Sequence, residues 1–256
     1  MKRNSARISR GGATGSSIGS WIARCIGGLA FTHALCAQAG DIPAFSQMQE
    51  GGPVVGWNSL RPAPRAAETI YTLVRDGEQV VLKADADHAM SGLVVSVRVD
   101  LAKTPILRWR WKISAPVASA DMSKKSGDDY AARIYVMFDY PRAKLSLATR
   151  AKLRLAEAVY GQAIPTAALN YVWDNTHPIG TIAPNSYTDR ARMLVVESGT
   201  ERAGQWQTAS RDVAADFRAA FGEEPPPVLA VALATDTDNT GEHVVSWYGD
   251  LRFVAR

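Results

Sequence analysis

The sequence predicts a mainly β protein whose core is an antiparallel β-sandwich with two short helical insertions. Apolar and polar residues alternate with a period of two in several segments, clearly at 93–99 and 107–113, as in strands that bury one face. Glycine, proline and aspartate separate these segments, as in turns between strands. About ten such segments with only two helical stretches among them fit a sandwich better than repeated β–α units.

Residues 1–39 have the pattern of a secretory signal peptide. Four basic side chains lie within residues 2–10, an apolar stretch runs from about 18 to 35, and an Ala-Gln-Ala cleavage motif ends at Ala39. Arg24 interrupts the apolar stretch, and the alternative is an uncleaved anchor, although so short a segment is a poor span for a bilayer core of roughly 30 Å. We therefore expect a periplasmic or secreted protein with no transmembrane segment after cleavage.

Removing this leader changes the charge balance. Residues 1–39 hold five of the 29 basic side chains and none of the 25 acidic ones, so residues 40–256 carry 24 basic and 25 acidic side chains, a net charge of −1. Both cysteines, Cys25 and Cys36, also lie in the leader. The mature chain is therefore expected to have no disulfide, no thiol nucleophile and no cysteine-bound zinc, and its charge does not favour nucleic-acid binding.

The mature chain is expected to form a single β-sandwich domain over 69–256, after an irregular segment over 40–68 that is rich in Gly, Pro and Ala. Asp76-Gly77 marks a hairpin between the first two strands. The strands are expected at 69–74, 78–83, 91–100, 105–113, 129–139, 167–174, 192–198, 227–235 and 242–253.

Two stretches have helical composition. Residues 142–160 contain neither Gly nor Pro, and residues 211–222 end at Gly222 before a proline run. In the second stretch, Asp212 and Asp216 are expected to cap the helix and to pair with its arginines. The first stretch presents either a solvated face or a surface for an envelope protein partner, and its basic side chains are Lys144, Arg150, Lys152 and Arg154.

Residues 129–139 form two faces if they are a strand. The face expected in the core consists of Tyr130, Ala132, Ile134, Val136 and Phe138. The other face carries Asp129, Arg133 and Tyr135, with Asp128 at the mouth of the strand. It is either an outer face of paired charges or the floor of a site that binds a saccharide or another small polar molecule.

A basic row on the preceding strand is the expected neighbour of this face. Arg108, Arg110 and Lys112 alternate there with apolar residues. Because this strand is the nearest in sequence, we expect Arg110 to lie close to Asp129 and Arg133 in one groove.

Aromatic residues offer a second candidate for ligand contact. Trp173, with Asn170 and Asp174, has the composition of an aromatic platform with polar arms, the chemistry that commonly contacts sugars. The alternative is that Trp173 belongs to the core. Burial in the sandwich is also the expectation for Trp109, Trp111 and Trp247.

The segment 234–242 resembles the start of a calcium loop. Asp236, Asp238 and Thr240 supply oxygens at alternate positions before Gly241, but Trp247 stands at the twelfth position, where an EF-hand has its glutamate. A hairpin turn whose polar side chains bind their own backbone explains the same residues. Apart from this calcium, no cofactor is expected.

Six stretches together resemble a family of exported bacterial proteins, the domain of unknown function family 3047. They are RWRWKI, GDDYAARIYVMF, NYVWDN, RDVAADFRAAFGEEPP, ATDTDNTG and SWYGDLRF, and they extend from about 57 to 253. The resemblance implies export and carries no activity or catalytic residue. The strand layout also looks like the jelly-roll sandwiches of galactose-binding-like and carbohydrate-binding modules, a likeness of fold only.

Three functional hypotheses follow. The first is a non-catalytic module that binds a polar ligand such as a saccharide. The second is a hydrolase of envelope polymers that uses Asp128 or Asp129 with a distant carboxylate, such as Asp174, Asp212 or Asp250. The third is an interaction module that docks another envelope protein through residues 142–160.

Overall fold

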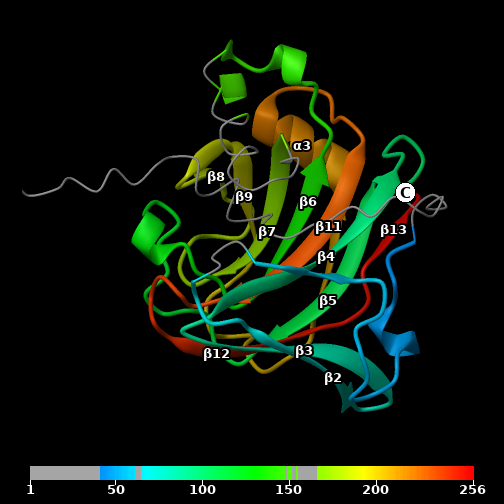
Figure 1. Cartoon of the computed structure of the whole chain (residues 1–256), viewed down its shortest axis with the longest axis vertical. Helices are drawn as coiled ribbons and strands as arrows, with labels where there is room; N and C mark the ends of the chain where they lie inside the picture. Colours follow the sequence, from blue (N-terminus) through cyan, green and yellow to red (C-terminus); the bar gives the residue numbers. More distant parts are fainter. Residues whose placement is uncertain (1–40, 62–64, 148, 152–153, 155–165) are drawn as a thin grey trace, which may run out of the picture.

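The structure is a computed structural model that describes residues 41–61, 65–147, 149–151, 154 and 166–256. Two sheets pack into a sandwich (Figure 1), which confirms the predicted fold class. The predicted signal peptide over 1–39 lies outside the described residues.

One sheet has seven strands in the order β1-β4-β11-β6-β7-β9-β8. Its strands are β1 (Asn58–Leu60), β4 (Met90–Val99), β11 (Val228–Asp236), β6 (Arg133–Phe138), β7 (Ala167–Asp174), β9 (Thr188–Ser198) and β8 (Ile182–Asn185). Neighbouring strands are antiparallel except β7 and β9, which are parallel. The sequence had suggested a purely antiparallel sandwich, and the parallel pairing of β7 and β9 is a departure from that prediction.

The other sheet has six strands, in the order β10-β5-β12-β3-β2, with β13 also paired to β5. Its strands are β10 (Gln207–Asp212), β5 (Ile106–Ile113), β12 (His243–Tyr248), β3 (Gln79–Asp87), β2 (Ile70–Asp76) and β13 (Arg252–Val254). The Asp76-Gly77 hairpin between β2 and β3 is confirmed, with Gly77 at a φ of 64°.

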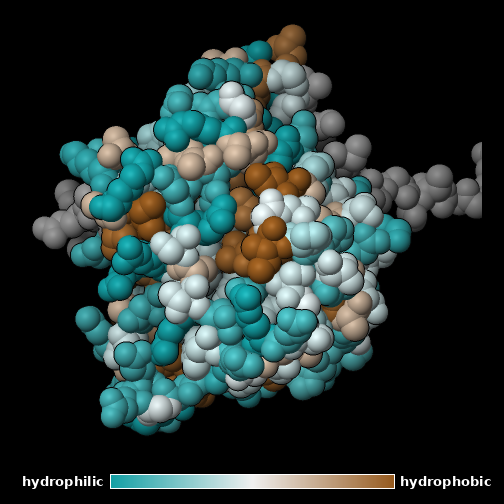
Figure 2. Space-filling model, turned by 180° about the vertical axis from the view of Figure 1, so that it is seen from behind, coloured by the Kyte–Doolittle hydropathy of each residue, from teal (hydrophilic) through white to brown (hydrophobic). Residues whose placement is uncertain are grey.

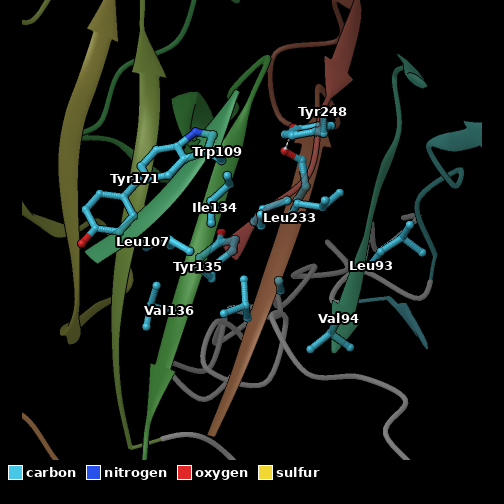
Figure 3. Close-up of a cluster of buried hydrophobic side chains, with 14 of the residues drawn as sticks. Leu93, Val94, Leu107, Trp109, Ile134, Tyr135, Val136, Tyr171, Leu233 and Tyr248 are labelled. Atoms are coloured by element: carbon cyan, nitrogen blue, oxygen red, sulfur yellow. Dashed lines mark hydrogen bonds between the residues drawn. The ribbon is translucent and has the colours of Figure 1, made fainter. Parts of the chain in front are cut away.

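The core between the sheets is built around large aromatic side chains. Trp109 of β5 packs on Tyr171 of β7 with ring centroids 5.3 Å apart (Figure 3), and Trp111 packs near Trp173 with centroids 6.1 Å apart. All four side chains are at most 2% exposed. This interdigitation joins the two sheets, and it explains the alternation of β5: its apolar row faces inward and its basic row faces outward.

The helix predicted at 211–222 is confirmed as α3 (Val213–Phe221). Asp212 caps its start by accepting a hydrogen bond from the backbone N–H of Ala215 at 3.0 Å, and Gly222 ends it in the left-handed conformation with a φ of 70°. Arg211 pairs with Asp216 as expected, whereas Arg218 pairs with Glu224 beyond the helix.

The helix predicted at 142–160 is seen only in part. Arg142–Lys144 form a 3-10 turn, and 147, 149–151 and 154 are helical, while 148, 152–153 and 155–160 lie outside the described residues. Whether this stretch binds an envelope partner stays a prediction.

The segment expected to be irregular at 40–68 contributes to the sandwich. It contains a 3-10 turn, Phe45–Gln47, and β1, which pairs with β4. Phe45, Trp57 and Leu60 are buried in the core. The sequence did not reveal these buried residues, because the segment is rich in Gly and Pro and because a strand of three residues is too short to show a period of two.

The surface is mainly hydrophilic on the face seen from behind, around smaller apolar groups (Figure 2). The exposed large apolar side chains lie on different elements and are Val55, Ile70, Leu147, Ile179 and Ile182. Within the described residues, no helix is long and apolar enough to cross a membrane.

Candidate functional site

Arg133 lies at the start of β6 in a buried cluster of charges. Its guanidinium forms an ion pair with Asp236 at the end of β11, and its Nη1 lies 3.6 Å from Asp128 Oδ1. The guanidinium also lies over the rings of Tyr130 and Tyr135, 5.3 and 5.6 Å from their centroids. Arg133 is 0% exposed, so its charge is balanced inside the protein.

The loop before β6 covers this face of the seven-stranded sheet. Strand β6 begins at Arg133 and not at Asp129, so Asp128 and Tyr130 belong to the loop. Tyr130 and Met122 pack against outward-facing side chains of β7 and β9, which are Val172, Met193 and Val195. Every residue of β6 is buried. The expectation that Asp129, Arg133 and Tyr135 form the open floor of a groove is therefore wrong.

Asp129 clamps the turn between β11 and β12. Its carboxylate accepts hydrogen bonds from the backbone N–H and the Nδ2 of Asn239, at 3.0 and 2.9 Å, and from the backbone N–H and the Oγ1 of Thr240, at 2.7 and 2.8 Å. Two candidate sites that are 110 residues apart in sequence thus meet in one cluster.

This cluster also contains the residues proposed for calcium. Carboxylate oxygens of Asp129, Asp236 and Asp238 all lie within 4.8 Å of one another. However, Asp129 and Thr240 bind each other, and Asp236 pairs with Arg133. Because existing donors already balance much of the negative charge, the hydrogen-bonded turn accounts for these residues without an ion, and calcium binding stays a prediction.

Asp128 is a buried carboxyl of the cluster whose acidity is strongly perturbed. It is 1% exposed, and burial raises its pKa to about 7 although the nearby Arg133 opposes the change. Its Oδ1 accepts a hydrogen bond of 3.4 Å from Asn185, and its Oδ2 has no hydrogen-bond partner in the described part of the chain. Asp128 and Asp129 thus have separate partners, which does not suit a carboxylate pair that flanks one bond.

Substituting Asp128 with Asn should stabilise the protein at pH 8 and change its stability little at pH 4. The folded-state pKa of about 7 exceeds the unfolded value of about 3.9. The stability linked to the protonated acid is therefore fully present below about pH 4 and is lost as the pH rises through 7. Linkage sets an upper bound of about 4 kcal/mol on the gain. Urea unfolding at both pH values measures this gain in stability. Asp139→Asn, a substitution at an exposed position, is the control. An equal effect of Asp128→Asn at the two pH values would contradict the assignment.

The other residues proposed for ligand contact on β7 are buried. Trp173 is 1% exposed, packs near Trp111 in the core and donates a hydrogen bond of 3.0 Å to the carbonyl of Gly199. Asn170 is 0% exposed beside Met193 on the face that carries Arg133. The core alternative therefore holds for Trp173, which offers no exposed ring to a sugar.

Arg110 lies on the other sheet. Strand β5 does not adjoin β6, whose neighbours are β11 and β7, so Arg110 cannot share a groove with Asp129 and Arg133. Its side chain runs over Gly249, where a Cβ atom would lie 2.5 Å from Arg110 Cγ, and Nη2 donates a hydrogen bond of 2.7 Å to Gln79. This glycine allows Arg110 to lie flat on the outer face of the six-stranded sheet.

A groove of about 690 Å³ opens on this outer face, and we call it the outer groove. Its polar lining comes from neighbouring strands and from the link between β12 and β13. Its polar lining residues include Gln79, Arg108, Arg110, Thr208, Ser210, Asp250 and Arg252. Asp250 also anchors the N-terminal segment, because it accepts hydrogen bonds from the N–H and Oγ of Ser46 at 3.0 and 2.5 Å.

A row of cations and tryptophans continues from the outer groove through Arg110. The Arg110 guanidinium lies 4.3 Å from the ring centroid of Trp206, and the Lys112 ammonium lies 4.6 Å from that of Trp247. Both indoles are half-buried. Lys112 pairs with Asp76 and holds the pKa of that carboxyl below its usual range. The expectation that Trp247 belongs to the core is wrong, because it faces outward beside Lys112.

Sequence reasoning missed several residues of the outer groove. Thr208 and Ser210 lie on β10, which was not predicted, and Trp206 directly precedes it. The alternation of exposed Thr208, buried Ala209 and exposed Ser210 was the available signal, but it is only six residues long and runs into α3. The three carboxylates considered as distant catalytic partners are dispersed: Asp174 ends β7, Asp212 caps α3 and Asp250 lines the groove.

The chain is thus a jelly-roll-like β-sandwich with an open groove, lined by polar and apolar residues, on one sheet. A sequence model of the family described as "Protein of unknown function (DUF3047)" matches residues 55–252, and the chain belongs to this family. No curated protein sequence matches it significantly.

Several solved structures have a similar fold. A family 12 xyloglucanase from Bacillus licheniformis is 11% identical, with a TM-score of 0.42 over 76% of this chain and 89% of that one. An endoglucanase from Rhodothermus marinus is 11% identical, with a TM-score of 0.41 over 78% and 92%. The family 30 carbohydrate-binding module of a Clostridium thermocellum cellulase is 10% identical, with a TM-score of 0.36 over 85% and 95%. Values this low carry no argument about ligands or activity.

Proposed function

We propose that this chain is an exported, non-catalytic protein that binds a saccharide in the outer groove. The observation that carries the proposal is an open groove of about 690 Å³ whose polar lining adjoins a half-buried tryptophan. This volume is within the range of small-molecule sites, roughly 300–1,000 Å³. Export is inferred from the leader pattern of residues 1–39, with the periplasm or the medium as destination.

The lining chemistry suits a sugar. Gln79, Thr208 and Ser210 are exposed and offer amide and hydroxyl groups that both donate and accept hydrogen bonds. Trp206 lies beside them across Arg110 and is half-buried, and an indole face packs well against the C–H groups of a sugar ring. The hydroxyl groups of a sugar would thus bind the polar side chains, while its apolar face would pack against the indole.

Binding without catalysis is supported by the acidic groups of the groove. Asp250 is the carboxylate among the described lining residues, and Ser46 engages both of its oxygens. Glycoside hydrolysis typically needs two carboxyl groups on either side of the bond. The perturbed Asp128 lies in the loop before β6, which covers the other sheet.

Trp206→Ala should weaken saccharide binding by about tenfold or more, as expected for the loss of a partly buried aromatic contact. A thermal-shift screen of residues 40–256 against envelope sugars and polysaccharide fragments, with a chelator control, comes first. Ligand at about 100 times its Kd should stabilise the fold by about 2.7 kcal/mol. The Kd of each hit is then compared between the wild type and Trp206→Ala.

Tyr187→Ala is the matched control, because Tyr187 is a half-buried aromatic residue beside Lys125, in the turn between β8 and β9 of the other sheet. It should leave the Kd unchanged. Absence of any hit across the panel, or equal losses of affinity in the two variants, would refute the outer groove as a saccharide site.

A further inference from the structure

Two arginines lie opposite each other in the outer groove. Arg252 of β13 and Arg108 of β5 are direct cross-strand partners, and both are exposed. Directly opposed residues have Cβ atoms roughly 5 Å apart, so the two positive charges oppose each other on the same face of the sheet. Such a pair destabilises a sheet unless an anion lies between the side chains.

The neighbouring carboxylates do not neutralise this pair. Asp250 binds Ser46, Asp76 pairs with Lys112, and Asp212 pairs with Arg256. Neither Arg108 nor Arg252 forms an ion pair with any described residue. The two guanidinium groups are therefore available to a ligand, and the groove has an excess of positive charge in a chain whose residues 40–256 are close to neutral.

The groups around the pair extend the recognition surface. Ser210 is opposite Arg108 on its other side, and Thr208 is opposite Arg110 on the next outward-facing row. Strands are about 4.8 Å apart, so Arg252, Arg108 and Ser210 form a row about two strand spacings wide. This width matches a sugar ring that carries an anionic group, with hydroxyl contacts on either side of the charge.

We propose that the saccharide held in the outer groove is acidic, with a carboxylate or sulfate group bound between Arg108 and Arg252. The inference rests on the proposed function and specifies its ligand class. Guanidinium groups bind carboxylates and tetrahedral oxyanions through paired, charge-assisted hydrogen bonds, which are about twice as strong as neutral ones. The anion also relieves the repulsion between the two arginines.

The test compares an acidic oligosaccharide with its neutral form. Oligogalacturonate and its methyl ester have the same sugar backbone but differ in charge, and a sulfated glycosaminoglycan fragment provides the sulfate arm. By isothermal titration at low salt, an acidic probe should bind about tenfold or more tightly than the ester. Arg108→Gln/Arg252→Gln should remove that preference, because it should weaken binding of the acidic probe far more than binding of the ester. Arg98→Gln, an exposed arginine of β4 on the other sheet, is the charge-matched control and should change neither affinity.

The outcomes separate the inference from the proposed function. If neutral sugars bind while acidic probes show no preference, or if the double variant keeps the preference, the inference is overturned and saccharide binding stands. If no saccharide of either charge binds, both fail. If sodium sulfate alone raises the melting temperature in a manner that depends on Arg108 and Arg252, while no acidic saccharide binds, the pair is a simple anion site and the inference is again overturned.

Discussion

Replacing Arg133 with methionine should lower the free energy of unfolding by about 3–5 kcal/mol, because it leaves buried carboxylates without their cation. Asp236 and Asp128 both face Arg133, and all three residues are at most 1% exposed. Methionine fills much of the vacated space beside Met90, so the loss reports the missing charge more than a cavity.

Urea unfolding at pH 8, where Asp128 is mostly ionised, measures this effect. Arg98→Met, at an exposed position of β4, is the control and should cost less than about 0.5 kcal/mol. Adding Asp236→Asn to Arg133→Met should restore part of the stability, since the double variant no longer buries that unpaired carboxylate. Equal costs for Arg133→Met and Arg98→Met would show that the buried ion pair does not stabilise the fold.

Much of the fold could be predicted from the sequence, because each strand buries one or both of its faces and therefore has a recognisable pattern of apolar residues. The alternation of β5, the Asp76-Gly77 hairpin and the Gly222 stop are all local signals, and each has a local physical cause. What the sequence could not show was which sheet each strand joins. Strands β5 and β6 follow each other along the chain, yet they belong to different sheets.

The candidate site was mispredicted for this reason. A period of two shows that Arg133 and Ile134 point to opposite sides of β6, but it does not show what covers each side. The loop that carries Asp128 and Tyr130 covers the side with Arg133, which converts an apparent binding floor into a second buried layer. The basic row of β5 was recognised correctly, but Arg252, the cross-strand partner of Arg108 on β13, comes from the C-terminal end of the chain. Such long-range pairing leaves no periodic signal in the sequence.

Asp129→Ala should destabilise the protein by about 3 kcal/mol or more and should free the turn at Asn239 and Thr240. The carboxylate accepts four hydrogen bonds, two of them from backbone N–H groups. Hydrogen bonds to a charged group contribute about 1.5–3 kcal/mol each when measured singly, and those that share one side chain are not additive. Asn239→Ala removes only one of the four donors and should cost about 1 kcal/mol.

Amide hydrogen exchange gives the local readout for this prediction. In the wild type, the N–H groups of Asn239 and Thr240 should be protected, and Asp129→Ala should remove that protection while β11 stays protected. Calcium provides a second comparison, since Asp129 also belongs to the carboxylate cluster with Asp236 and Asp238. If the cluster holds calcium, the ion should raise the melting temperature of the wild type and not of Asp129→Ala. If the carboxylate acts only as a clamp, calcium and chelator should have no effect on either protein. Unchanged protection at residues 239 and 240 in the variant would mean that the turn is held by other contacts.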